Sequence, residues 1–111
     1  IDDKIEEIKK TKDVVSLLEL LKLGDDVQRA SRRTIKAGKG ALRGRPYRRK
    51  KSVLIIVKSD KGIGKAAVNI PGVEVSLAKN INVEILAPGG HAGRLALYSE
   101  SAVNELKNLF K

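Results

Sequence analysis

The stretch Ser52–Lys58, with the sequence SVLIIVK, decides the fold that we expect for this chain. Its residues from Val53 to Val57 are all apolar, and most of them are β-branched. β-Branched residues favour strands, and a strand without polar alternation is typical of the centre of a parallel sheet, where both faces are covered. The stretch therefore predicts a central strand that is buried on both faces.

The residues that follow this strand alternate between helix and strand signals. Residues 63–70 (IGKAAVNI) are predicted to form a short helix that a Pro-Gly pair ends. Residues 73–79 (VEVSLAK) are predicted as a second strand and residues 94–99 (RLALYS) as a third. This order predicts right-handed parallel crossovers in a layered α/β sheet.

Two polar side chains in this part are candidate helix caps. Ser99 precedes SAVNELKNLF, whose apolar residues recur at helical spacing, so a C-terminal helix is predicted there. Residues 80–88 (NINVEILAP) are ambiguous. Their apolar spacing permits a strand, but Asn82 can also cap a single helical turn.

The N-terminal residues carry helix signals of their own. Ile1–Leu23 is predicted to be helical, because its apolar residues recur at helical spacing and acids gather at its start. Thr11 is a second candidate N-cap within this segment. Gly24 is predicted to end the helix in the left-handed conformation, and Asp25 to cap a second helix over residues 26–36.

The composition bounds the domain organisation. A length of 111 residues predicts one domain, in which residues 1–36 cover the sheet, residues 37–51 form a basic loop and residues 52–111 supply the sheet. The absence of cysteine excludes disulfides, thiolate metal sites and cysteine nucleophiles. Because the chain begins at Ile1 and contains no methionine, we expect it to be a piece of a longer chain or a processed product.

The net charge of +10 is confined to one segment. Arg29–Lys51 contains eleven Lys or Arg residues and no acid, whereas the remaining residues carry 12 cations and 13 acids. Such a dense run of like charges repels itself, which a solvated surface does not relieve. The segment therefore predicts a polyanionic partner.

Residues 37–51 (AGKGALRGRPYRRKK) form the centre of this charged run. Their glycines and Pro46 are predicted to stop any helix, which leaves the segment extended or looped. The glycine spacing resembles a dinucleotide fingerprint, but that motif follows a strand and opens a helix, whereas this segment follows a charged helix. We interpret it as a basic strap along nucleic acid, in which Tyr47 can stack on an unpaired base.

Other candidate chemistry is sparse. Residues 60–65 (DKGIGK) lie between a strand and a helix, where a helix N-terminus can bind an anion, but Ala66 replaces the magnesium-binding Ser or Thr of a P-loop. A plain turn is the preferred interpretation, and a remnant of a Rossmann-type nucleotide-binding enzyme that uses this turn is the alternative. His91 is the single histidine and has no cysteine to join it as a metal ligand. The sequence predicts no catalytic residue, metal site or cofactor.

Three motifs in order closely resemble the archaeal and eukaryotic form of the ribosomal protein L4 family of the large subunit. They are AGKGALRGRPYRRKKSVLIIV, NIPGVEV and LAPGGHAGRLALYSESA, and the resemblance covers essentially the whole chain. It implies a Rossmann-like α/β sheet with flanking helices, incomplete here, plus a basic extended loop. The family also favours a helical turn at residues 82–86. Its N-terminal half, with further strands and a long loop that reaches the nascent-peptide tunnel, has no counterpart in these residues, so no tunnel role is implied.

The resemblance also implies a function and its residues. The expected protein is a structural component of the cytoplasmic large ribosomal subunit and not an enzyme. Its expected partners are ribosomal RNA and neighbouring ribosomal proteins, without a membrane or a small-molecule substrate. Contacts to RNA phosphate and shape are predicted from the charged run, at Arg32, Arg33, Lys36, Lys39, Arg43, Arg45, Tyr47, Arg48, Arg49, Lys50 and Lys51. A second matching loop adds Gly89, Gly90, His91 and Arg94.

Overall fold

Three parallel strands form the central sheet of the computed structural model, which describes residues 1–111. Their order is β4–β3–β5, with bounds Glu74–Leu77 for β4, Leu54–Val57 for β3 and Ala96–Tyr98 for β5. Ile55 at the centre of β3 lies beside Val75 of β4 and Leu97 of β5. The prediction of a central parallel strand is confirmed, and so are the two flanking strands, which are shorter than predicted.

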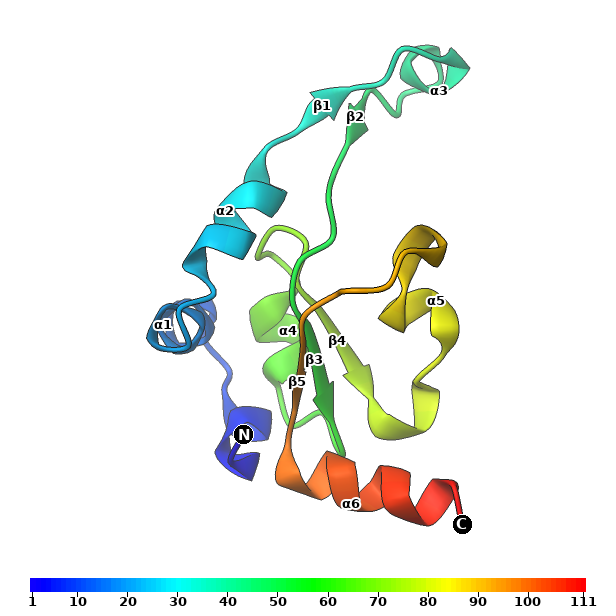
Figure 1. The fold of residues 1–111 in the computed structure, drawn as a ribbon. Helices are drawn as coiled ribbons and strands as arrows, with labels where there is room; N and C mark the ends of the chain where they lie inside the picture. Colours follow the sequence, from blue (N-terminus) through cyan, green and yellow to red (C-terminus); the bar gives the residue numbers. More distant parts are fainter.

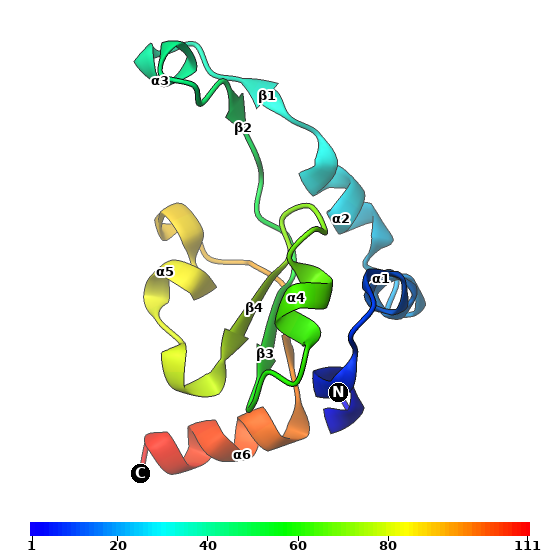
Figure 2. The same ribbon diagram turned by 180° about the vertical axis from the view of Figure 1, so that it is seen from behind.

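The other elements surround this sheet and form the mixed α/β fold of Figures 1 and 2. The α-helices are α1 (Thr11–Leu20), α2 (Gly24–Ser31), α3 (Lys39–Leu42), α4 (Ile63–Ala67), α5 (Val83–Leu86) and α6 (Glu100–Leu109). Single 3-10 turns are η1 (Asp3–Glu7), η2 (Ala78–Asn80) and η3 (Pro88–Gly90). Two short strands, β1 (Thr34–Ile35) and β2 (Tyr47–Arg48), form a separate antiparallel pair.

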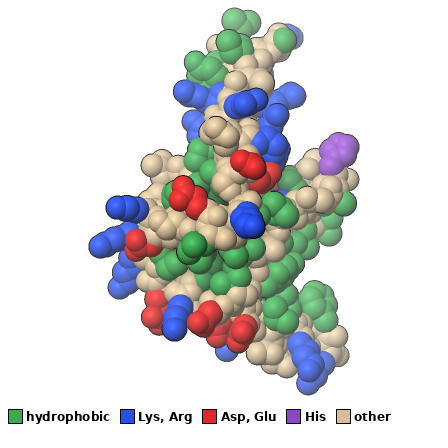
Figure 3. Space-filling view, turned by 60° about the vertical axis from the view of Figure 1, so that its left-hand side comes forward, with side chains coloured by type: hydrophobic (Ala, Val, Ile, Leu, Met, Phe, Trp, Pro, Cys, Tyr) green, Lys and Arg blue, Asp and Glu red, His purple; other side chains and the backbone are tan.

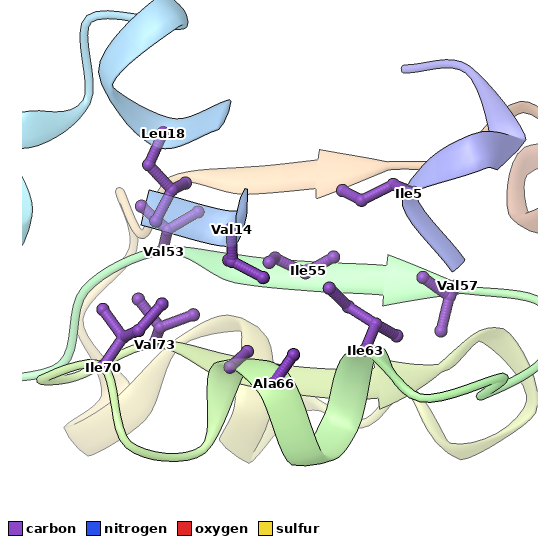
Figure 4. Close-up of a cluster of buried hydrophobic side chains, with 11 residues drawn as sticks. Ile5, Val14, Leu18, Val53, Ile55, Val57, Ile63, Ala66, Ile70 and Val73 are labelled. Carbon is purple, nitrogen blue, oxygen red and sulfur yellow. The ribbon is translucent and has the colours of Figure 1, made fainter. Parts of the chain in front are cut away.

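The first face of the sheet holds the main core. Side chains from η1, α1 and α4 converge on alternate residues of the central strand, as Figure 4 shows. The cluster comprises Ile5, Val14, Leu18, Val53, Ile55, Val57, Ile63, Ala66, Ala67, Ile70 and Val73. Ile55 is fully buried, and cutting such a side chain back to alanine costs about 2–5 kcal/mol.

The second face of the sheet is covered by fewer residues. Leu54 and Ile56 of β3 pack against Ala78 and against Ala102 of α6. Every residue of β3 is therefore buried, half on each face, because successive side chains of a strand point to opposite sides. This two-sided burial explains why the sequence of the strand lacks polar alternation.

Both predicted helix caps of the C-terminal part are confirmed. The Ser99 hydroxyl accepts a hydrogen bond from the Ala102 amide at 3.2 Å, at the start of α6. The Asn82 side chain accepts one from the Ile85 amide at 2.9 Å, at the start of α5. The ambiguous segment is therefore a helical turn, because the asparagine side chain supplies the acceptor that the first turn needs.

The prediction of one helix over Ile1–Leu23 is wrong. Residues 3–7 form the 3-10 turn η1, residues 8–10 are not helical, and Lys10 rather than Thr11 is the N-cap of α1. The physical reason is tertiary. Ile5 lies in the core, and the Glu6 carboxylate accepts hydrogen bonds from the ends of β3 and β5, which a continuous helix would not bring together.

The predicted junction between the first two long helices is also wrong in detail. Lys22, with φ of 58°, takes the left-handed conformation in place of Gly24, which instead begins α2. The Leu23 amide donates to the Leu18 carbonyl at 2.9 Å, so α1 closes two residues earlier than predicted. Leu23 is the N-cap of α2, and Asp25 lies inside its first turn.

Candidate RNA-binding surface

Residues 32–51 form an arm that projects from the body, as both ribbon views show. The two sides of the arm pair as an antiparallel ribbon, with Thr34 opposite Arg48 and Ile35 opposite Tyr47. The Lys36 amide also donates to the Pro46 carbonyl at 2.8 Å. The ribbon carries the helical turn α3 at its tip, beyond the reach of the core.

Two predictions for this region are corrected by the ribbon. The predicted helix over residues 26–36 ends at Ser31, because Thr34 and Ile35 pair with β2 instead of continuing α2. The segment 37–51 is not free of helix, since Lys39–Leu42 forms α3. Gly44, with φ of 73°, lets the chain reverse directly after that turn.

The cations of the arm lack acidic partners. Within the charged run, only Arg29 and Lys51 form salt bridges, with Asp26 and Glu74 respectively. The other nine make none and are exposed, apart from a half-buried Lys36: Arg32, Arg33, Lys36, Lys39, Arg43, Arg45, Arg48, Arg49 and Lys50. Figure 3 shows Lys and Arg side chains gathered on the projecting part of the molecule. Because no acid of the chain neutralises them, this surface carries a concentrated positive potential.

Tyr47 sits within this surface and is partly covered by a cation. The guanidinium carbon of Arg33 lies 4.8 Å from the centre of the Tyr47 ring, which is the geometry of a cation–π contact. Tyr47 remains 49% exposed, so part of the ring is free for a further contact.

The second predicted loop separates into exposed and internal residues. Gly89 and Gly90 have φ of 74° and 76°, which shapes a tight turn and exposes His91. The Arg94 guanidinium points inward, with a side chain only 4% exposed, although a contact to RNA was predicted for it. It donates to the Glu74 carboxylate and to the backbone carbonyls of Ser52, Ile85 and, at 3.4 Å, Gly72. Arg94 therefore holds the loop against the base of the arm.

Glu74 is the shared acceptor at this junction. It forms salt bridges with both Lys51 and Arg94, the latter at 2.8 Å. Burial by itself raises the pKa of the Glu74 carboxyl, but hydrogen bonds and charge from the two cations outweigh it and hold the pKa below its usual range. The carboxylate thus stays ionised and ties the arm to the loop.

The structure brings the two predicted segments together around a polar hollow of about 250 Å³. Lys51 lines one side of it, and His91 and Arg94 line the other. Two further lining residues, Asp26 and Arg29, were not predicted. Arg29 donates to the Lys51 carbonyl at 2.9 Å and to Asp26 at 2.9 Å, which fixes the end of the arm on α2. Their spacing of three residues on a helix is the only signal in the sequence for this pairing.

The alternative phosphate site at residues 60–65 is already occupied by the chain itself. The Asp60 carboxylate accepts from the Gly62 amide at 2.9 Å and from the Gly64 amide at 3.0 Å. A phosphate needs these same amide donors, and an acid in their place repels an anion. The geometry therefore supports the interpretation as a plain strand-to-helix turn.

No group of three or more His, Asp and Glu side chains is placed to hold a metal ion. None of the helices combines the length and the apolar character needed to cross a membrane.

Fold and surface together define a small α/β protein built around a projecting basic arm. The chain belongs to the family described as "Ribosomal protein L4/L1 family", whose model matches residues 1–109. Its predicted resemblance to that family is thereby confirmed.

Curated archaeal relatives match over nearly the whole chain, and each is named large ribosomal subunit protein uL4. The relative from Methanosphaera stadtmanae is 49% identical and covers 100% of this chain. The relative from Archaeoglobus fulgidus is 46% identical over 96% of this chain, and that from Methanocaldococcus jannaschii 44% identical over 100%. The chain spans only 43%, 42% and 44% of these three relatives, which is less than half of their length.

Proposed function

We propose that this chain is a structural part of the large ribosomal subunit in the cytoplasm, where its arm binds ribosomal RNA. The observation that carries the proposal is the set of nine arm cations without an acidic partner. RNA presents one phosphate per nucleotide, and neutralising those phosphates releases condensed counterions, which drives association. Membership of a family whose relatives are named as large-subunit proteins supports the same assignment.

The contacts are mainly to phosphate and to RNA shape. Arginine presents a planar fork of donors that matches phosphate, and a lysine ammonium adds a mobile point charge. The two-stranded ribbon carries these groups on exposed backbone, which leaves them accessible to a folded RNA from more than one side. The exposed turn at Gly89, Gly90 and His91 lies across the polar hollow from Lys51 and extends the same surface.

Arg94 has a supporting role in this proposal. Because its guanidinium is engaged by four groups inside the body, it orients the second loop and the start of β3 and does not itself meet RNA. Neighbouring ribosomal proteins are further partners, since a subunit packs its proteins against RNA and one another.

The sheet fits the same assignment as an incomplete Rossmann-like layer. Parallel strands β4 and β5 flank β3, with helices on both faces, and the outer edges of both flanking strands pair with no other strand of this chain. Additional strands at these edges would complete a larger sheet of the same kind.

The decisive experiment measures how RNA affinity depends on salt. Changing Arg43, Arg45, Arg48 and Arg49 together to glutamine removes four phosphate contacts. The slope of log affinity against log salt concentration is expected to fall by about 3, at roughly 0.7–0.9 for each contact. The RNA is a large-subunit transcript from an archaeal relative.

A matched variant changes four exposed cations outside the arm, Lys9, Lys10, Lys12 and Lys107, to glutamine. It has the same loss of net charge, and its slope is expected to stay within about 1 of the parent slope. An arm variant that keeps the parent slope, or a control that loses as much as the arm variant, would contradict the proposal.

A further inference from the structure

The two faces of the arm ribbon carry different chemistry. In an antiparallel pair, side chains of directly opposite residues share a face, and successive residues alternate. Ile35 and Tyr47 are opposite each other and therefore lie on one face, while Thr34 and Arg48 lie on the other. Arg33 belongs to the face of Tyr47, because its guanidinium lies over that ring.

The face formed by Arg33, Ile35 and Tyr47, here called the stacking face, is apolar and uncovered. Ile35 is 80% exposed and Tyr47 is 49% exposed. Neither belongs to a hydrophobic cluster of the body, since both clusters consist of residues around the central sheet. An isoleucine and an aromatic ring side by side on a projecting ribbon gain nothing from the fold, so a partner is needed to cover them.

The charge around the stacking face restricts that partner. The run from Arg29 to Lys51 contains eleven cations and no acid, so the surface attracts a polyanion. The apolar surfaces that RNA offers to a protein are the faces of its bases, and these are accessible where a base is unpaired. Bases stack on aromatic rings and on the flat guanidinium of arginine, and the stacking face presents both, already in contact.

We propose that the stacking face binds an unpaired nucleobase of the RNA, while Arg48 on the opposite face contacts phosphate. This inference rests on the proposed binding of ribosomal RNA and adds which face meets a base. The base stacks on Tyr47 and Arg33, and Ile35 packs against its edge or its ribose. The arm thus distinguishes RNA that exposes an unstacked base from a regular duplex.

The test compares alanine variants on the two faces of the ribbon. Tyr47→Ala and Ile35→Ala alter the stacking face, and Thr34→Ala is the matched control, since it removes a β-branched residue beside Ile35 on the opposite face. All three leave the charge unchanged. The probes are a large-subunit transcript from an archaeal relative and a fully paired RNA duplex, and circular dichroism verifies that each variant keeps its fold.

On the large-subunit transcript, Tyr47→Ala is expected to weaken binding by roughly 5- to 140-fold with an unchanged salt slope. Tyr47→Phe and Thr34→Ala are expected to stay within about 2-fold. Ile35→Ala is expected to lie between Thr34→Ala and Tyr47→Ala. On the duplex, all variants are expected to bind like the parent. Dimethyl sulfate, which modifies unpaired adenines and cytosines, is expected to reach at least one position in the Tyr47→Ala complex that the parent protects.

Three results would overturn the inference without touching the proposed function. One is a parent that binds with a steep salt slope while Tyr47→Ala and Ile35→Ala bind equally well. Another is an equal loss for Tyr47→Ala on the transcript and on the duplex. A third is loss of a neighbouring protein from assembled subunits with unchanged protection of the RNA bases, which would assign the face to a protein partner. A parent without salt-dependent RNA affinity would instead refute the proposed function itself.

Discussion

Replacing Glu6 by alanine is expected to destabilise the fold by about 3 kcal/mol, although the residue lies in a single 3-10 turn near the N-terminus. The side chain is only 4% exposed. Its carboxylate accepts from the Lys58 amide at 2.8 Å and from the hydroxyls of Ser59, Ser99 and Ser101 at 2.8, 3.2 and 3.1 Å. It therefore joins η1 to the ends of β3 and β5 and to the start of α6.

The magnitude follows from the donors that the change leaves behind. A buried donor without an acceptor costs about 1–3 kcal/mol, and hydrogen bonds to a charged group are at the upper end of that range. The Ser59 and Ser101 hydroxyls can turn to solvent, but the Lys58 amide is fixed by the strand and the Ser99 hydroxyl is buried. Two stranded donors give about 3 kcal/mol, which corresponds to a fall of roughly 12 °C in melting temperature.

The assay is urea unfolding followed by far-ultraviolet circular dichroism, because the chain has no tryptophan. Trimethylamine N-oxide is present in all samples to keep the variants folded at the start. The matched control is Glu7→Ala, since Glu7 is the neighbouring acid and its side chain is 67% exposed in a salt bridge with Lys61. The control is expected to change stability by at most about 0.5 kcal/mol. Equal effects of the two changes, or less than about 1 kcal/mol for Glu6→Ala, would refute this reasoning.

The same residue gives a pH dependence with a defined sign. Burial alone raises the pKa of Glu6, but the four hydrogen bonds outweigh it and leave the pKa below its usual value of 4.5. A carboxyl whose pKa is lowered by folding contributes stability above its unfolded pKa and loses it as pH falls through the folded pKa. The stability difference between the parent and Glu6→Gln is therefore expected to be constant near neutral pH and to shrink below about pH 4.5.

Other predictions follow from the junction at the base of the arm and from the exposed sheet edges. Arg94→Lys is expected to lower stability by about 2 kcal/mol in urea unfolding while the salt slope of RNA binding stays unchanged, and a flatter slope would show that Arg94 meets RNA. Gly72→Ala is expected to cost at least about 3 kcal/mol in the same assay, because φ is 74° and the new methyl would lie 2.7 Å from the Lys50 carbonyl and 2.8 Å from the Ala30 side chain. Gly90→Ala, with φ of 76° and no atom within 4 Å, is expected to cost only about 1 kcal/mol, so equal losses would exclude the steric explanation. The isolated chain in dilute buffer is expected to be weakly stable and aggregation-prone, and bound RNA to raise its melting temperature. A sharp thermal transition that RNA does not change would contradict that expectation.

Local signals in the sequence predicted the elements whose formation depends on neighbouring residues. The continuous apolar run in β3 predicted its central position, because a strand covered on both faces has no exposed side to carry polar residues. Asn82 and Ser99 predicted two helix starts, since a cap needs only its own side chain and an amide three residues later. The uncompensated charge of the arm was likewise a property of the sequence alone.

The path of the N-terminal residues and the roles of individual cations depended on partners far away in the chain. Glu6 binds groups more than fifty residues distant, and these bonds break the helix that the local pattern favours. Arg94 lies in a basic motif, yet Glu74 and three carbonyls hold it inside the body, which its neighbours in the sequence do not indicate. Periodicity and composition report how a segment behaves by itself. Burial of a charge, pairing of two distant strands and the choice between a surface arginine and an internal one are decided by free energies that arise only when those segments meet in the folded chain.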